Sequence, residues 1–213
     1  MDVSRLNAAM RAVASAMQTP VILILMLLLA FTVFLIGWVI VEFFTERRLL
    51  KAKLPALVDA LNETKNRDET KACVAKSGLL KRQRAALTEL LSHPELTPLM
   101  RESLAVRIVT EEQSHYDVRL KTSDLVARIA PLLGLLGTLI PLGPGIIALG
   151  QGDTMTLSSS LMTAFDTTIL GLISAAVAMV ISTIRKNWYN NYMSVLETAA
   201  ECILEVEKRN DEA

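Results

Sequence analysis

The sequence has little of what most enzymes and metalloproteins are built from. It contains two cysteines, two histidines and 5% aromatic residues, and its net charge is zero. Cys73 and Cys202 lie far apart without a metal-ligand spacing, so we expect reduced thiols in place of a disulfide framework. His93 and His115 also lack the spacing of a zinc site or a triad, and we expect them to be solvated or locally bonded.

Recognisable catalytic patterns are missing as well. The sequence has no glycine-rich phosphate loop with its lysine, no paired carboxylates in a catalytic context and no spacing that favours a Ser-His-Asp arrangement. The basic clusters are interleaved with glutamate and lie beside hydrophobic segments, which argues against a nucleic-acid surface. We therefore predict a protein that is not an enzyme and that needs no cofactor and no metal.

What the chain does have is long apolar runs. Hydrophobic residues make up 52% of it, with a mean hydropathy of +0.40, which is typical of a membrane protein with one soluble portion. Val21–Val41 carries no charge and is long enough to cross a bilayer. Thr19 and Pro20 are predicted as its N-cap and first helical residue. A cleavable signal peptide is the alternative, but its apolar region is usually only ~7–15 residues long.

Two further spans follow, at Ile129–Gly152 and about Ser158–Ile184. Basic residues gather after the first span, before the second and after the third, whereas Gly150–Leu157 has none. By the positive-inside rule, the N-terminus lies outside and the long middle segment and the C-terminus lie in the cytoplasm. The basic residues are Arg47, Arg48, Lys51, Lys53, Arg119, Lys121, Arg128, Arg185 and Lys186.

The fold class predicted is all-α, since apolar residues recur three and four apart and no strand alternation is present. Helix breaks are expected near Asn62–Arg67, at Gly78 and around His93-Pro94. Glu95–Arg128 is expected to run as one helix into the second span, and the third span to continue past Arg185. The predicted segments are 1–19 (outside, a short helix), 20–41 (first span), 42–128 (cytoplasmic helical domain), 129–149 (second span), 150–157 (outside turn), 158–184 (third span) and 185–213 (cytoplasmic helix).

The last two spans carry stripes of small and hydroxylated residues at helical spacing. Close helix packing alone explains such stripes, and Pro141 and Pro144 add an expected kink. Thr138 and Thr168 also offer hydroxyl groups that can hold water or relay a proton without a permanent charge. The two stripes are Gly134, Thr138, Pro141, Gly145 and Ala148, and Thr168, Gly171, Ala175, Ala178 and Ser182.

Asp166 is the one acid within the second and third spans. Residues two apart on a helix are separated by about 200°, so Asp166 cannot share a face with Thr168 and lies nearer Thr163. An ionised acid at mid-membrane costs on the order of 3 kcal/mol. Asp166 therefore either sits close enough to the outer interface to stay wet, or has a proton or gating role at a helix or subunit contact, with Thr163 and Thr167 beside it.

Three segments resemble the signature region of the TolQ/ExbB/MotA proton-channel family. They are Ala130–Thr138 (APLLGLLGT), Leu142–Gly145 (LGPG) and Ala164–Leu172 (AFDTTILGL). The close match covers about Ala127–Arg185, and three spans make the chain more similar to TolQ and ExbB than to four-span MotA.

The resemblance implies a ring of identical subunits, commonly five, in the inner membrane around a dimer of a single-span partner similar to ExbD, TolR or MotB. Proton flow would be coupled to rotation and to work in the cell envelope. Thr138 and Thr168 would line the pore, while the proton-binding carboxylate would belong to the partner. Several ExbB-like members carry an acid about five residues before the third-span threonine, where this chain has Thr163.

Two other classes of function stay open at this point. The broken second span around Pro141–Gly145 suggests a secondary transporter with its own substrate site, although no inverted repeat is visible. A non-conducting membrane scaffold would need only the small-residue stripes. In either case we expect helix-packing or partner contacts at Gly134, Pro141, Gly145, Gly171 and Ala175. The driven process and the choice between proton and sodium are not encoded in recognisable motifs.

Overall fold

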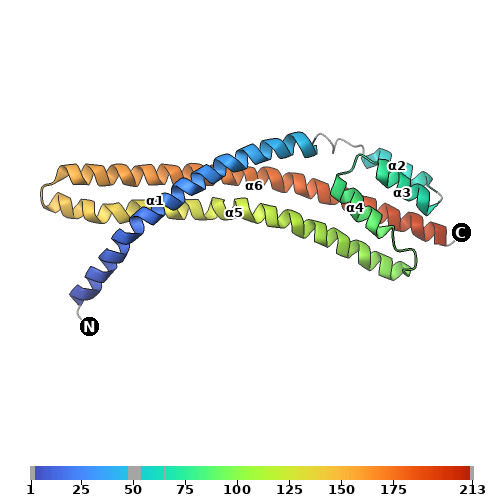
Figure 1. The fold of residues 1–213 in the computed structure, drawn as a ribbon, viewed down its shortest axis with the longest axis horizontal. Coiled ribbons are helices and arrows are strands. Elements are labelled where there is room, and N and C mark those ends of the chain that lie inside the picture. The colour runs from blue at the N-terminus through green and yellow to red at the C-terminus, as the bar shows by residue number, and fades with distance from the viewer. Residues whose placement is uncertain (1–2, 48–53, 65, 212–213) are drawn as a thin grey trace. The chain divides into compact units, whose positions relative to one another are not determined.

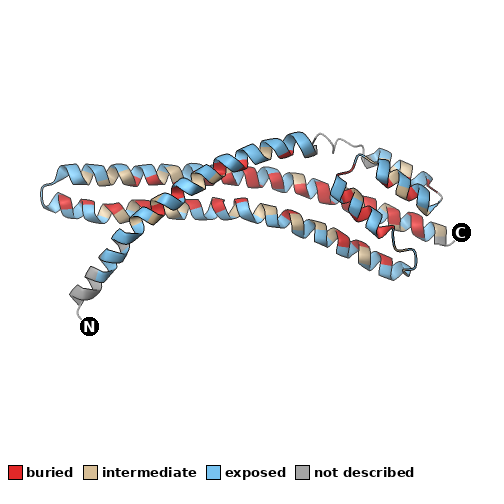
Figure 2. Ribbon diagram, viewed as in Figure 1, coloured by how far each residue is buried: buried red, intermediate tan, exposed pale blue. Residues whose placement is uncertain are grey.

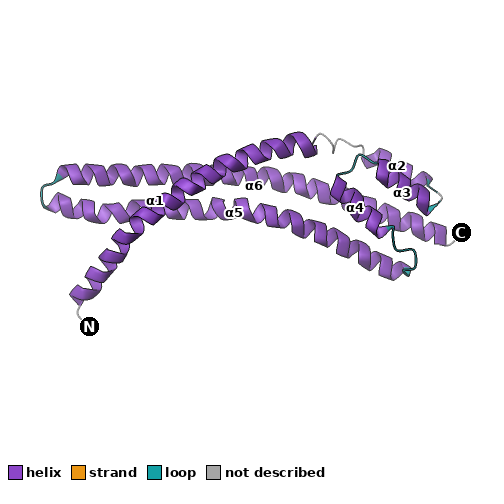
Figure 3. Cartoon of the chain, viewed as in Figure 1, coloured by secondary structure: helices purple, strands orange, loops and turns teal. Residues whose placement is uncertain are grey.

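The computed structural model describes residues 3–47, 54–64 and 66–211, and every regular element among them is helical (Figure 3). Helices α1, α5 and α6 are much longer than the rest, and a short turn joins α5 to α6. The elements are α1 (Val3–Glu42), a π-helix (Phe43–Arg47), α2 (Leu54–Glu63), α3 (Arg67–Lys76), α4 (Lys81–Leu90), α5 (Pro98–Gly150) and α6 (Thr154–Asp211).

Three of these helices, α1, α5 and α6, contain stretches long and apolar enough to cross a membrane. The expected breaks are confirmed: α2 ends at Glu63, α3 ends just before Gly78, and α4 ends before His93-Pro94. The expected continuous helices into the second span and out of the third are also confirmed by α5 and α6.

The helix start predicted at Thr19 and Pro20 is wrong, because α1 begins at Val3 and Pro20 lies inside it. Proline removes one intrahelical hydrogen bond, but the alanine-rich segment before it has a high helix propensity and continues the helix. A second difference is at α6, which begins at Thr154, inside the segment expected as a turn. Asp153 caps this start by accepting hydrogen bonds from the backbone N–H and the hydroxyl group of Thr156, at 3.0 and 2.5 Å.

The chain divides into two compact units. The span unit comprises residues 1–38 and 121–183, and the bundle unit comprises residues 39–120 and 184–213. In the span unit, α5 and α6 run antiparallel and form a hairpin that α1 crosses obliquely (Figure 1). Its outward surface is largely apolar, as expected of helices in lipid.

The bundle unit has a conventional apolar core. Leu61, Leu87, Leu90, Leu196 and Ile203 are almost completely buried within one cluster formed by residues of α2 to α6. Three tyrosine rings, Tyr116, Tyr189 and Tyr192, pack within 4.6 to 6.1 Å of one another in the same core. The buried faces of these helices are coloured red in Figure 2.

Candidate functional site

The α5–α6 hairpin is held together by direct contact between glycine backbones. A Cβ atom added to Gly171 would lie 2.7 Å from the Ala130 carbonyl oxygen and 3.0 Å from the Gly134 Cα atom. At Gly145 an added Cβ would lie 3.0 Å from the Ser160 Cβ atom. Only glycine lets the two helices approach this closely, as in other tightly packed membrane helices.

Gly137 and Thr167 face each other at the middle of this contact. A Cβ atom added to Gly137 would lie 2.6 Å from the Thr167 Cβ atom, and the Thr167 side chain is buried. Its hydroxyl group donates to backbone carbonyls of its own helix, those of Thr163 and Ala164, at 3.0 and 2.9 Å. Thr167 is therefore a packing residue between the two helices.

Thr138 and Thr168 lie at the edge of the contact, and each is only half-buried. The structure thus places Gly137, not Thr138, at the centre of the α5 stripe, because the helices meet one residue away from the pattern inferred from spacing. The Thr138 hydroxyl donates to the Leu135 carbonyl at 2.7 Å, and the Thr168 hydroxyl to the Ala164 carbonyl at 3.0 Å. Their only hydrogen is committed, so both hydroxyl oxygens can still accept.

These two threonines share one side of the hairpin. Gly137 and Thr167 face each other across two antiparallel helices, and each following residue is rotated by about 100° in the same right-handed sense. A two-fold axis relates such a pair, so Thr138 and Thr168 turn to the same side. The preceding residue, Asp166, turns to the opposite side, where it is exposed in the single chain.

The remaining residues singled out in the sequence have simple positions. Pro141 and Ala175 are buried beside the glycine contacts, and Thr163 is half-buried with its hydroxyl group donating to the Ser159 carbonyl at 3.1 Å. None of the described residues forms a group of three His, Cys, Asp or Glu side chains able to hold a metal ion.

A polar contact that the sequence reasoning missed lies towards the other end of the hairpin. Ser182 of α6 donates a hydrogen bond to the Oδ1 atom of Asp124 on α5. Ser174, two turns away on α6, is completely buried, and its hydroxyl group has no hydrogen-bond partner in the described part of the chain. The small-residue stripe containing Ser182 was visible in the sequence, but nothing in it indicated Asp124 as the partner.

The bundle unit holds two buried ion clusters that were also missed. Glu42, at the end of α1, forms an ion pair with Arg185 at 3.0 Å and accepts a hydrogen bond from the Tyr189 hydroxyl at 2.5 Å. Burial and this hydrogen bond raise the pKa of Tyr189, which keeps its proton.

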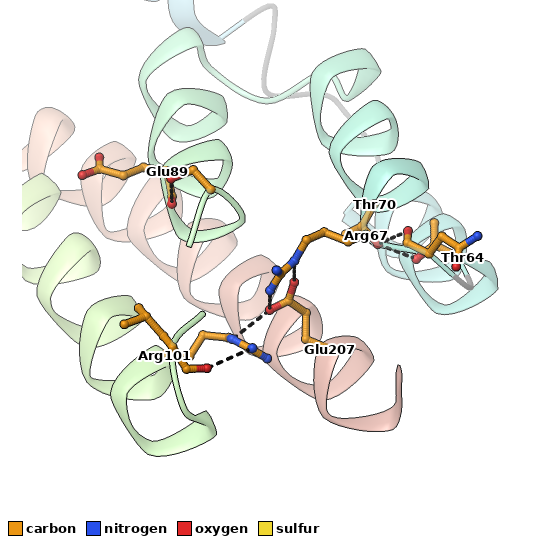
Figure 4. Close-up of polar contacts among 9 residues, drawn as sticks. Thr64, Arg67, Thr70, Glu89, Arg101 and Glu207 are labelled. Carbon is orange, nitrogen blue, oxygen red and sulfur yellow. Dashed lines mark hydrogen bonds and ion pairs between the residues drawn. The ribbon is translucent and has the colours of Figure 1, made fainter. Parts of the chain in front are cut away.

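In the second cluster, Glu207 of α6 lies between two guanidinium groups (Figure 4). Arg67 donates to it from both Nε and Nη2, the latter at 2.7 Å, and Arg101 Nε lies 3.0 Å from it. Arg67 and Glu207 lie 140 positions apart and Glu42 and Arg185 lie 143 apart, so no local sequence signal predicts either cluster.

Comparisons with known proteins agree on one family. A model described as the MotA/TolQ/ExbB proton channel family matches residues 74–198. The biopolymer transport protein exbB1 of Vibrio cholerae serotype O1 is 30% identical over 116 residues, which is 51% of this chain and 49% of that protein. The chain thus matches about half the length of this curated relative.

Proposed function

Since the chain belongs to the MotA/TolQ/ExbB proton channel family, we propose that it is the ring-forming subunit of a motor driven by the proton motive force. It works in the cytoplasmic membrane with a single-span partner similar to ExbD, TolR or MotB. The ring, with five copies, surrounds two copies of this partner. The N-terminus lies outside and the C-terminus in the cytoplasm, in keeping with the basic residues beside the spans.

The observation that carries the proposal is the common side of Thr138 and Thr168. Two hydroxyl groups from different helices border one surface of an otherwise apolar hairpin, and each oxygen keeps a free acceptor position. Around a closed ring, this surface faces the centre and makes a band of acceptors at one depth.

The chemistry of this band suits a partner that carries the proton. A protonated carboxyl group on the partner helix donates to a threonine oxygen, and the carboxylate formed after proton release loses that bond. Because threonine stays neutral, it favours the protonated partner without trapping a charge in the membrane. Each protonation step then changes which subunit the partner contacts, and this couples proton flow to rotation and to work in the cell envelope.

The test is proton uptake by vesicles that contain the chain and its cognate single-span partner. Thr138→Val and Thr168→Val each remove one hydroxyl group at almost constant shape, and a lost hydrogen bond of about 1.4 kcal/mol would slow proton flux about tenfold. Thr183→Val is the matched control, since the exposed Thr183 hydroxyl also donates to a carbonyl of its own helix, at 2.9 Å.

Normal proton flux in both Thr138→Val and Thr168→Val would contradict the proposed pore. Assembly into a ring that conducts with no partner at all would contradict the division of labour between the two proteins. A sodium flux of the same size, driven by a sodium gradient at constant pH, would show that sodium and not the proton is the transported ion.

A further inference from the structure

Asp166 is on the wrong side of the hairpin to face the pore. It begins a strip on α6 that continues inwards through Leu170, Ile173, Val177 and Ile181, at steps of four, three, four and four residues. Ile181 is buried and Val177 half-buried, whereas Ile173 is 49% exposed and Asp166 is also exposed. The strip is therefore covered at its inner end and open at its outer end.

Helix α5 accounts for the covered end, since Ile181 turns partly towards it, as the buried Ser182 does from the other side of α6. Helix α1 belongs to the same unit, and its Val21, Leu25 and Leu35 are almost completely buried, so α1 packs on the hairpin. Figure 1 shows α1 crossing the hairpin and continuing beyond α5, away from α6.

The outer part of α1 has no partner among the described residues of its own chain. Met10, Val13 and Met17 are exposed, and so are Ala12 and Ala16, which have the four-residue spacing of small residues at close helix contacts. Polar groups border this surface, with Ser15 and Thr19 exposed and Gln18 half-buried. One chain thus has an uncovered helix with hydrogen-bond donors and an uncovered strip with an acid.

We propose that the outer part of α1 packs on the Asp166 strip of the next copy of this chain. The side-chain amide of Gln18 or the hydroxyl group of Thr19 then donates a hydrogen bond to the Asp166 carboxyl group. This inference rests on the proposed ring, in which each α5 lies beside the α6 of a neighbour. The outer part of α1 extends past α5 of its own hairpin (Figure 1). In the ring it therefore lies over the α6 of the neighbouring copy.

The choice of a second copy follows from excluding two other occupants. Lipid does not cover Asp166 favourably, because an acid facing hydrocarbon costs on the order of 3 kcal/mol. The single-span partner of the proposed function lies on the side of Thr138 and Thr168, which Asp166 does not share. The contact joins two different surfaces, α1 and α6, and such a head-to-tail contact generates rings.

Disulfide cross-linking in the assembled complex tests the contact. In a chain with Cys73 and Cys202 replaced by serine, Gln18→Cys is combined with Leu170→Cys, one turn from Asp166 on the same strip, and oxidised in membranes. We expect a ladder of covalent multimers, because each link joins two chains. The matched control combines Gln18→Cys with Leu172→Cys, which is exposed on the pore side of α6, and it should give monomers.

The mass of the non-oxidised complex, measured in parallel, separates this inference from the proposed function. A ring of the expected mass without a ladder, or with only intrachain links, overturns the α1–α6 contact and leaves the proposed function intact. Monomers alone overturn both. A ladder from the Leu172 control equal to that from Leu170 places α1 on the wrong side and overturns the contact.

Substitution of the acid adds a readout of its role in the contact. Asp166→Asn keeps a hydrogen-bond acceptor, so its ladder should equal that of the parent. Asp166→Leu removes the acceptor, and the loss of an interhelical hydrogen bond in a membrane should lower the cross-linked fraction about threefold. An unchanged ladder in Asp166→Leu would overturn the hydrogen bond.

Discussion

At the scale of single residues, buried charges affect the stability of the bundle unit more than exposed charges do. Glu207 is 4% exposed and forms ion pairs with two guanidinium groups from two other helices. Removing one member of a buried ion pair leaves an uncompensated charge, which costs more than the pair itself contributes.

We therefore expect Glu207→Gln to destabilise the bundle unit by about 3 kcal/mol. Glu205→Gln, two residues away and exposed, changes the same charge and should leave the stability almost unchanged. Denaturant titration of the purified protein, followed by helical circular dichroism, compares the two. Equal midpoints in the two variants would contradict a buried role for Glu207.

His115 should make stability depend on pH. Burial lowers its pKa, with a further contribution from Arg82 and Arg119, against a smaller opposite effect of Glu112. The unfolded chain therefore binds a proton at a higher pH than the folded chain does. Stability due to neutral His115 is complete above about pH 6.5 and is lost as the pH falls below that value.

The measurement is the thermal midpoint of the wild type and of His115→Gln between pH 7.5 and 5. The midpoint of the wild type should fall more steeply towards pH 5, and the substitution should remove that extra dependence. Parallel curves for the two proteins would assign the pH dependence to other groups.

At the scale of the elements, the glycine contact between α5 and α6 makes the sharpest prediction. Gly171→Ala places a methyl group against the Ala130 carbonyl oxygen and the Gly134 backbone, neither of which can move without separating the helices. Gly143→Ala is the matched control, since no described atom lies within 4 Å of the added Cβ.

Gly171→Ala should therefore lower the thermal midpoint and the proton flux of the complex. Gly143→Ala should lower neither of them. Overpacking a close contact costs about 1–3 kcal/mol, and alanine in an open helical position is slightly favourable. Full flux in Gly171→Ala would mean that the hairpin tolerates a wider spacing.

The elements also show where sequence reasoning succeeds. The long continuous helices and the breaks at Gly78 and His93-Pro94 follow from local chemistry, namely periodicity and helix-breaking residues. Pro20 does not start α1, because the alanine-rich segment before it has a high helix propensity and continues the helix to Val3. Contacts such as Arg67–Glu207 and Ser182–Asp124 depend on which helices pack together, and local spacing does not carry that information.

At the scale of the whole molecule, the proposed function predicts that this chain does not conduct protons without its partner. The hairpin offers threonine acceptors, and Asp166, the acid nearest to them, faces away from them. Vesicles containing this chain alone should take up protons no faster than empty vesicles, and co-expression with the cognate partner should restore uptake. Uptake by the chain alone, abolished in Asp166→Asn, would make this acid the carrier.

The π-helix that follows Glu42 has a consequence for insertions and deletions. Such a turn accommodates one residue more than an α-helical turn of the same length. Deleting one residue within Phe43–Arg47 lets the segment relax into an α-helix, while the Glu42–Arg185 ion pair keeps the end of α1 in place. An added residue has no comparable slack, so length changes here are tolerated in one direction only.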